Sequence, residues 1–197
     1  MRKKSGFTLL ELLIVLVIAS ILWAMLFPVF ARARESARKI QCLSGLVQLG
    51  AALHLYAADW GGAFPPKDNE WGPLDPYARN RDVFRCPDDS ELPAVPAQTE
   101  SGNQQPVHIE SSYIYRSGLS NDGRTTDIIA FDRWIWHLGG RNIVFLDGHG
   151  AWFSAAAFWP IAPSQVLALD PVFRALSPEQ QKAAREGQQI PGKLSWK

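Results

Sequence analysis

Glu11 is the first residue whose chemistry needs an explanation, because it is the single ionisable side chain in an apolar run from Phe7 to Phe30. A carboxylate at the centre of a membrane helix costs about 2.5–3.5 kcal/mol on insertion scales, and less near a helix end. Glu11 is therefore either an accidental charge near the membrane interface or a functional group. The residues that surround it decide between the two.

A second group of chemistry-bearing side chains lies towards the other end of the chain, at His137, Asp147 and His149. Together with Asp127 or Asp132, these side chains could gather around a metal ion. Carboxylates with carbonyl oxygens suit Ca²⁺, whereas two histidines suit a transition metal. No pair of these residues has the spacing of a dedicated metal site, so a metal ion is the less favoured interpretation.

The same segment also has a purely structural interpretation, which we favour. Asp147-Gly148 lies between two β-rich stretches and predicts a tight hairpin with positive φ values at the turn. His137 would then cap the turn at Gly139-Gly140 or pack against Trp134 or Trp136.

Composition and motifs exclude several classes of function. The 20 Lys and Arg residues nearly balance the 19 Asp and Glu residues, and some of the basic residues precede the apolar run. No strongly basic field therefore marks a nucleic-acid partner. The chain has no nucleophile elbow, phosphate-binding loop or HExxH motif, and nothing groups its Ser, His and Asp residues. We expect a protein that is not an enzyme and that needs no cofactor.

The apolar run predicts a helix that lies in a membrane. Such a helix would be roughly 36 Å long, enough to span the hydrocarbon core of a bilayer. It is longer than the apolar core of a secretory signal, and the small residue Gly6 precedes it rather than follows it. Arg2, Lys3 and Lys4 come just before it. We therefore expect a single-pass protein of the inner (cytoplasmic) membrane, with its N-terminus in the cytoplasm and its C-terminal domain outside.

This helix should continue past the membrane as the spine of a domain. Beyond Phe30, apolar residues recur at helical spacing in two adjacent rows, namely Ile40, Leu43 and Val47, and Leu46, Leu49, Leu53, Tyr56 and Trp60. The stripe should bury against a sheet, and Gly45 and Gly50 should permit close packing. Because Gly61-Gly62 predicts a helix end, one helix should run from about Phe7 to Ala58.

Signals for a sheet follow a turn-rich stretch over 61–110, in which 77–84 could form a short helix. The strand candidates are residues 112–116, 127–132, 142–146 and 150–153. Three or four antiparallel strands would cover the helix stripe. In the tail, Ser177-Pro178-Glu179-Gln180 predicts a capping box that opens one short polar helix, which ends by Gly187.

Cys42 and Cys86 are the two cysteines of the chain. The expected topology places both outside the cytoplasm, where disulfides persist. A bridge would close a loop of about 45 residues, which stabilises by roughly 4 kcal/mol in the chain-entropy model. It would also join the helix to the body. Two buried free thiols are the alternative.

The residues around Glu11 resemble the type IV prepilin family, which includes the pseudopilins of type II secretion. The mark of this family is a short basic leader ending in Gly, then Phe-Thr-Leu-Leu-Glu and an apolar helix. This chain reads Arg2-Lys3-Lys4-Ser5-Gly6 and then Phe7-Thr8-Leu9-Leu10-Glu11. The resemblance implies an α+β, pilin-like fold, in which a long N-terminal helix packs on a small antiparallel β-sheet.

The resemblance also implies roles for individual residues. A membrane prepilin peptidase would cut between Gly6 and Phe7 and methylate the new amine of Phe7. Glu11 would pair with that amine, its own or a neighbour's, during filament assembly, since both charges lack water in lipid. The implied partners are the prepilin peptidase/methyltransferase, other pilin-like subunits in a homo- or hetero-filament, an inner-membrane assembly platform and membrane lipid.

His137, nine further residues and then Asp147-Gly148 are similar to the C-terminal signature of a large subgroup of prepilin-like proteins. In that subgroup the motif is named from its association with prepilin processing. The segments around Cys42 and Cys86 also look like the pattern of this subgroup. The role of the motif does not follow from the resemblance.

The expected organisation is a leader over 1–6, a transmembrane and filament-core helix over 7–30, a pilin-like domain over 31–154 and a C-terminal extension over 155–197. The expected function is that of an assembly subunit in a type IV pilus-like or type II secretion pseudopilus filament, in the periplasm or at the cell surface.

A membrane-tethered binding module that uses the prepilin route for sorting only is the alternative. A metal-dependent envelope enzyme built round His137 and Asp147 is less favoured. Pilus, pseudopilus and DNA-uptake apparatus all remain open as the parent machine, and so does a major or minor role.

Overall fold

The computed structural model describes residues 8–90, 92, 109–135, 137 and 139–188. Gly6 and Phe7, the predicted cleavage and methylation site, lie outside these residues. The chain divides into two compact units, Met1–Ala37 and Arg38–Lys197. Each unit is described by itself below.

Helix α1 (Leu9–Asp59) begins close to the predicted start and continues through Pro28 without a break. By length and composition it is the one helix in the described part of the chain that could cross a membrane. It ends where the sequence predicts, because Gly61 and Gly62 adopt φ values of 63° and 87°. The Gly62 N–H donates to the Ala57 carbonyl at 2.7 Å, as in a Schellman cap.

The second half of α1 buries one row of side chains, at the spacing of a helix face. These are Cys42, Leu46, Leu49, Leu53 and Tyr56. Two predicted members of the stripe are wrong, because Ile40 and Trp60 are 62% and 61% exposed. Ile40 lies to one side of the buried row, whereas Trp60 follows the last helical residue and stacks on the Tyr56 ring from outside.

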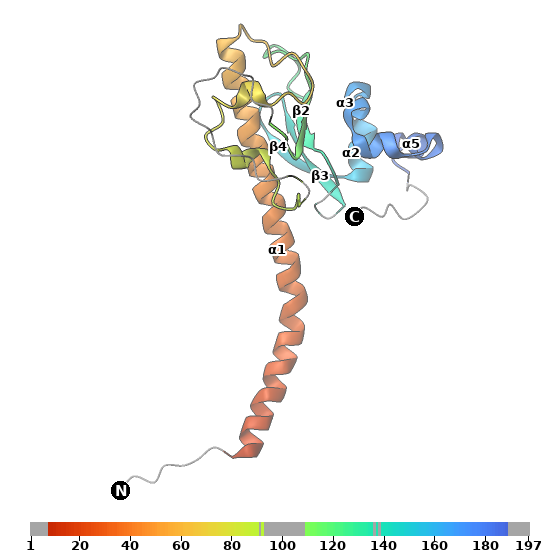
Figure 1. Ribbon diagram of the computed structural model, residues 1–197. Coiled ribbons are helices and arrows are strands. Elements are labelled where there is room, and N and C mark those ends of the chain that lie inside the picture. Colours follow the sequence, from red (N-terminus) through yellow and green to blue (C-terminus); the bar gives the residue numbers. More distant parts are fainter. Residues whose placement is uncertain (1–7, 91, 93–108, 136, 138, 189–197) are drawn as a thin grey trace. The chain divides into compact units, whose positions relative to one another are not determined.

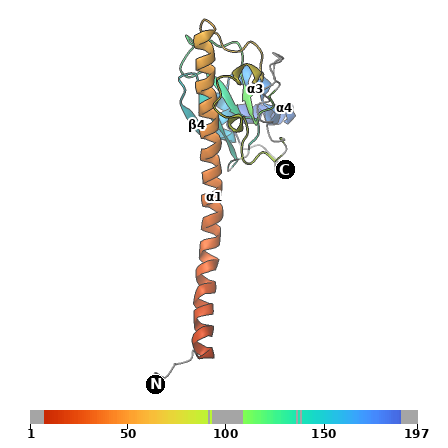
Figure 2. The same ribbon diagram turned by 60° about the vertical axis from the view of Figure 1, so that its left-hand side comes forward.

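The predicted antiparallel sheet is confirmed, with four strands in the order β1-β2-β3-β4. Its strands are β1 (Tyr113–Tyr115), β2 (Ile128–Asp132), β3 (Gly140–Phe145) and β4 (Gly150–Ser154). Strand β3 starts two residues before the predicted strand. The second half of α1 lies along this sheet (Figures 1 and 2).

Alternate residues of the strands enter two separate cores. Tyr113, Ile129 and Val144 pack with the buried row of α1, whereas the neighbouring residues Ile128 and Ile143 face the other core. This alternation is the period-2 pattern of a strand that is buried on both faces.

Glycines let α1 approach the sheet, as predicted. A Cβ atom added at Gly50 would lie 2.8 Å from Cγ1 of Val144. A Cβ atom at Gly45 would lie 3.3 Å from the Tyr113 hydroxyl oxygen. Both distances are tighter than ordinary van der Waals contact, so a side chain at either glycine would push the helix and its neighbours apart.

Two short 3₁₀ helices, η1 (Gly72–Leu74) and η2 (Arg81–Phe84), lie in the described part of the stretch between α1 and the sheet. The helix predicted over 77–84 is therefore only its last four residues. The Arg81 guanidinium donates to both oxygens of Asp75, at 2.7 and 2.6 Å, and this pair fixes η2 beside η1.

The C-terminal extension differs most from prediction, because its described part, up to Gln188, contains four helices rather than one. They are α2 (Ala155–Ile161), α3 (Ser164–Leu169), α4 (Pro171–Ala175) and α5 (Pro178–Arg185). The predicted capping box of α5 is present, with Ser177 and Gln180 bonded reciprocally. The first three helices are too short to give a clear helical period, so sequence periodicity did not reveal them.

These helices cover the face of the sheet that α1 leaves open (Figure 1). Their apolar side chains, such as Phe158, Val166 and Phe173, are buried with Phe131 and Ile143 of the sheet. The extension therefore completes the second core, and the sheet is covered on both faces.

A buried ion pair joins the extension to the sheet. Nη1 and Nη2 of Arg141 lie 3.1 and 3.2 Å from the two carboxylate oxygens of Asp170, and both side chains are fully buried. The guanidinium also lies over the Phe158 ring. Asp170 in turn accepts the Val172 N–H at the start of α4 and the indole N–H of Trp159.

We predict that Asp170→Asn lowers the free energy of unfolding of the body by about 3–5 kcal/mol, because Arg141 would keep a buried charge without its carboxylate. The amide can still cap α4, so the loss reports the charge. The measurement is urea unfolding of the full chain in detergent micelles, followed by Trp fluorescence. The double variant Arg141→Met/Asp170→Asn buries neither charge and should recover part of the loss. A double variant less stable than Asp170→Asn would contradict the prediction.

Candidate functional site

Glu11 is held at the N-terminus of α1 by a capping box with Thr8. The Thr8 N–H and hydroxyl donate to Oε2 of Glu11, at 3.0 and 2.8 Å. The Glu11 N–H donates back to Oγ1 of Thr8 at 3.3 Å. In the single chain, therefore, the Glu11 carboxylate and the Thr8 hydroxyl each satisfy one N–H group at the start of the helix that would otherwise lack a partner.

The first half of α1 presents large apolar side chains on all sides. They are half or more exposed at most positions, for example at Leu9, Trp23, Phe27 and Phe30. Exposed apolar side chains all round a helix are stable in lipid or against other helices, but not in water.

The structure joins Cys42 of α1 to Cys86, just after η2, by a disulfide with a Cα–Cα distance of 5.1 Å. The sequence separation of the two cysteines is 44 residues. In the chain-entropy model such a bridge stabilises by roughly 4 kcal/mol. Both cysteines are buried in the first core, where the bridge ties the helix to the loop segment that packs beside it.

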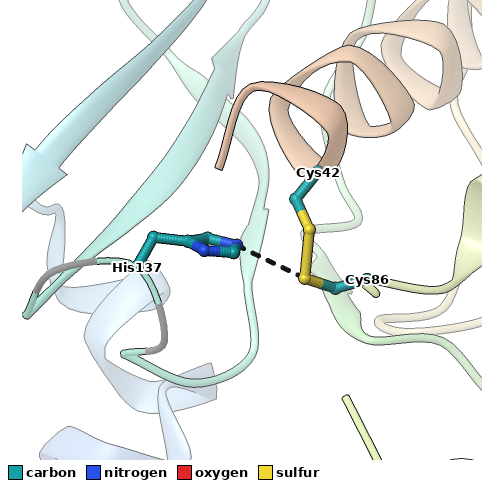
Figure 3. Close-up of side chains that lie close together, drawn as sticks. All are labelled: Cys42, Cys86 and His137. Atoms are coloured by element: carbon teal, nitrogen blue, oxygen red, sulfur yellow. Dashed lines mark hydrogen bonds between the residues drawn. A yellow bond between two sulfur atoms is a disulfide. The ribbon is translucent and has the colours of Figure 1, made fainter. Parts of the chain in front are cut away.

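His137 lies against this disulfide, with its side chain fully buried (Figure 3). Its Nε2 atom is 3.3 Å from Sγ of Cys86. Its Nδ1 atom is 3.2 Å from Oδ2 of Asp88, whose other oxygen accepts a hydrogen bond from Arg38 at 2.8 Å. Three segments that are far apart in the sequence therefore meet at one bridge.

The turn that carries His137 is fixed by two hydrogen bonds to its carbonyl oxygen. The donors are the Gly140 N–H at 3.1 Å and the Trp152 indole N–H at 3.0 Å. Nζ of Lys39, on α1, lies over that indole ring, 4.8 Å from its centroid. Gly139, with a φ of 74°, makes the turn.

Gly140 has no room for a side chain. A Cβ atom there would lie 2.3 Å from the carbonyl oxygen of Phe153 and 2.5 Å from the Trp152 ring. The glycine therefore lets the Trp152 ring close over the backbone next to His137. Of the predicted roles for His137, capping of the Gly139-Gly140 turn is made by its backbone carbonyl, whereas its ring faces the disulfide.

Asp147 and Gly148 form the hairpin turn between β3 and β4, as predicted. Only Gly148 has a positive φ, at 84°, so the expectation of positive φ at Asp147 is wrong. This arrangement fits a three-residue loop with glycine in the left-handed position. Asp147 instead accepts hydrogen bonds from the backbone N–H and ring of His149, which hold the pKa of its carboxyl below the usual value.

The structure does not bring the candidate metal ligands together. His137 precedes β3 and Asp147 follows it, and a strand of that length spans roughly 17 Å. His149 shares the exposed turn with Asp147, whereas Asp127 accepts the Arg124 N–H in the loop before β2. The nine residues between His137 and Asp147 therefore correspond to strand β3 and the residues of the turns at its two ends.

Two residues of the site around His137 were missed by sequence reasoning. They are Asp88, which follows Cys86-Pro87, and Arg38, which lies in the helix after the apolar run. The signal that could have found Asp88 is its place directly after Cys86-Pro87, since a proline fixes the direction of the chain. No signal in the sequence relates Arg38 to either residue.

Asp132, the last residue of β2, is a buried carboxyl close to this region. Its Oδ2 atom accepts the Asn142 N–H at 2.7 Å. Burial raises the pKa of Asp132 to about 7, because it outweighs the opposing effects of the Asn142 N–H and the Arg141 guanidinium. The carboxyl is therefore largely protonated in mildly acidic solution.

Two family models match parts of the chain. Residues 1–27 match the family described as "Prokaryotic N-terminal methylation motif". Residues 31–76 match a family described as "Protein of unknown function (DUF1559)". The two matches divide α1 between them, with its apolar half in the first and its buried row in the second.

The chain is also similar to proteins named "Type II secretion system core protein G". It is 33% identical over 86 residues to that of Klebsiella pneumoniae, which covers 41% of this chain and 61% of the relative. It is 40% identical over 58 residues to that of Aeromonas hydrophila, with coverage of 29% and 41%. It is 37% identical over 68 residues to that of Vibrio cholerae, with coverage of 34% and 46%. The chain thus spans less than two thirds of each relative.

No solved structure is significantly similar to this chain. The pilin-like arrangement therefore rests on the elements themselves, a long N-terminal helix packed on a four-stranded antiparallel sheet.

We predict that the buried carboxyl of Asp132 makes stability fall as pH rises. Its pKa is about 7 when folded and has the ordinary value of 3.8 when unfolded. The folded chain therefore binds the proton more tightly, and the stabilisation is complete below about pH 4 and lost as the pH rises through about 7. The expected fall in the free energy of unfolding is about 2–4 kcal/mol.

The measurement is urea unfolding at a series of pH values. Asp132→Asn keeps the shape of the side chain and should flatten the profile between about pH 4 and 7. Asp127→Asn, at the other end of β2, is the matched control and should keep the wild-type slope. An Asp132→Asn profile as steep as that of the wild type would contradict the assignment.

Proposed function

We propose that this chain is a structural subunit of a type II secretion pseudopilus-like filament, made as a precursor with a short basic leader. One observation carries the proposal. The first half of α1 is apolar on all sides and exposed, and its single carboxylate stands at the start of the helix. This half lies within the segment that matches the N-terminal methylation motif.

Processing would follow from that motif. A prepilin peptidase removes residues 1–6 by cutting after Gly6, and Phe7 becomes the methylated N-terminus. Before assembly, the first half of α1 anchors the subunit in the cytoplasmic membrane, with unit Arg38–Lys197 outside. The basic residues of the leader stay in the cytoplasm in this topology.

Assembly would transfer the apolar half of α1 from lipid to a bundle of identical or related helices. Packing of apolar helices only replaces their contacts with lipid, so it does little to fix how neighbouring helices align along their axes. A charge pair between Glu11 and the Phe7 amine of a neighbour would supply register, because both charges are costly in apolar surroundings without a partner. The carboxylate would then exchange its capping box with Thr8 for the amine.

The body would decorate the outside of the filament and perform no catalysis. Core proteins of type II secretion systems are the named relatives, so we infer partners of the same kind. These are other pilin-like subunits, the prepilin peptidase and an assembly platform in the inner membrane. The covered sheet and the buried ion pair of Arg141 make the body a compact unit suited to this passive role.

We predict that Glu11→Leu keeps membrane insertion and reduces incorporation into filaments at least tenfold, because the register-setting charge is lost. The measurement is the amount of subunit in sheared filaments relative to the membrane fraction. Ser20→Leu is the matched control, since Ser20 is a polar residue on the same exposed half of α1 that bonds only to the Val17 carbonyl. Wild-type incorporation of Glu11→Leu would refute the assembly role of the carboxylate.

We predict that Gly6→Val blocks removal of the leader, because a branched side chain would fill the place of glycine in the peptidase site. The intact mass of the membrane-purified protein should then include residues 1–6, whereas a Ser5→Ala control should show the mature Phe7 terminus. A mature terminus in Gly6→Val would contradict the proposed cut site.

The alternative function, a tethered binding module, gives a different result for the wild-type protein. Wild-type protein that is processed but stays in the membrane fraction, and is absent from sheared filaments, would favour that alternative.

A further inference from the structure

The imidazole of His137 uses both ring nitrogens on charged or reactive partners, although it lies in the core. Nδ1 faces the Asp88 carboxylate at 3.2 Å and Nε2 faces Sγ of Cys86 at 3.3 Å. Figure 3 shows the ring directed at the bridge, edge-on to the Cys86 sulfur. The filament proposal uses none of these groups.

The contact with sulfur is worth little while the bridge is closed. A carboxylate accepts only, so the ring nitrogen that faces Asp88 carries a proton and a neutral ring leaves Nε2 as an acceptor. A disulfide sulfur has no hydrogen to donate. A Cys86 thiol in the same place does have one, so the geometry suits the reduced state or the moment at which the bridge forms.

We propose that His137, oriented by Asp88, is the acid–base group that accepts the thiol proton of Cys86 when the Cys42–Cys86 bridge forms and returns it when the bridge opens. Arg38 completes the arrangement by holding the second oxygen of Asp88. The order carboxylate, imidazole, sulfur is the one by which proteins activate a nucleophile.

The reaction needs an external disulfide, either a small molecule or a protein oxidant. Its sulfur first forms a mixed disulfide with Cys42, releasing one thiol. Nε2 of His137 then takes the Cys86 proton, and the Cys86 thiolate attacks the Cys42 sulfur. The mixed bond breaks, and the departing thiolate takes up a proton to become the second thiol. Two protein thiols are oxidised and one external disulfide is reduced.

The orientation assigns different roles to the two cysteines. Nε2 of His137 contacts Sγ of Cys86 at 3.3 Å, so Cys86 is the attacking thiolate on closing and the leaving thiolate on opening. Both cysteines are buried in the folded chain, Cys42 at 1% and Cys86 at 0% exposure. The exchange therefore takes place while the body is still closing around the bridge.

Other charged groups stand near enough in the fold to be varied in a test. Asp89 bonds to Ser112, whose hydroxyl accepts the Cys86 N–H. Lys39 follows Arg38 on α1 and lies over the Trp152 ring. Asp88 contacts the ring itself, with its Oδ2 atom 3.2 Å from Nδ1 of His137.

The expected effect depends on pH in a way that packing alone does not. An ordinary thiol titrates near pH 8.5, and an adjacent imidazolium commonly lowers this by about two units. At about pH 6 the thiolate fraction would then rise about 75-fold, while a weaker nucleophile loses about eightfold. Closure should therefore be about tenfold faster with His137 than without it. At about pH 9 most of the thiol is ionised without help from a base, so the advantage given by His137 should disappear.

The experiment uses the reduced full chain in detergent micelles, mixed with an aromatic disulfide whose released thiol is coloured. The phase of release that does not depend on reagent concentration is ring closure. His137→Gln keeps an amide near the sulfur but cannot take the proton. His149→Gln is the matched control, because that histidine lies on the exposed hairpin turn.

We expect His137→Gln to close about tenfold more slowly than wild type at about pH 6 and at about the same rate at about pH 9. We expect Asp88→Asn to show the same convergence with a smaller amplitude, and His149→Gln to follow wild type. A His137→Gln profile parallel to wild type at every pH would overturn the proposal, since a merely structural role would shift the rate equally at all pH values.

A second measurement needs no change at His137. In the reduced Cys42→Ser chain, the ultraviolet absorbance of the Cys86 thiolate should titrate clearly below the ordinary midpoint of about 8.5. A midpoint at or above that value would overturn the proposal even if His137→Gln failed to fold.

Discussion

The burial of one row of α1 against the sheet is the interaction on which the rest of the body depends. Leu46, Leu49 and Leu53 can reach the sheet only because Gly50 leaves room for Val144. At roughly 1.5–3 kcal/mol for each fully buried side chain, this row outweighs any single polar contact in the unit. Cys42 begins the same row, so the helix that forms the core also delivers one half of the disulfide.

The second core buries the face of the sheet that α1 leaves open, and it does so at the expense of burying a charged group. A sheet covered on one face by α1 would leave Phe131 and Ile143 in water, and the extension α2–α5 removes them from it. The docking requires Arg141 to be buried, which is unfavourable unless Asp170 is buried with it. The ion pair is thus better understood as fixing where the extension docks than as adding to stability. A purely apolar contact would tolerate more than one position of the short helices.

The two sites share a physical principle, although one belongs to the apolar half of α1 and the other to the body. Glu11 and His137 are ionisable groups in apolar surroundings, and in the isolated chain each one contacts a polar partner nearby. For Glu11 the partner is Thr8 of the capping box, and for His137 it is Asp88. In both proposals the group acts when a second partner arrives, an amine for the carboxylate and a thiol proton for the imidazole. An ionisable group that already has a hydrogen-bond partner in the isolated chain lowers the stability of the fold little before the second partner binds.

The sequence by itself determined α1, its end at Gly61-Gly62, the four strands and the hairpin at Gly148, because these depend on local periodicity and turn chemistry. It also marked Glu11, since a charge in an apolar run is visible without a structure. Only the tertiary structure decided that His137 faces Cys86 rather than Asp147, because strand β3 separates the two ends of the motif while the turn at Gly139-Gly140 carries the histidine back to α1. The short helices α2, α3 and α4 of the extension were likewise decided by packing, since none is long enough to form a helix on its own and each is held by the apolar face that it covers. Helix α5 is the exception, because its capping box at Ser177 and Gln180 is visible in the sequence.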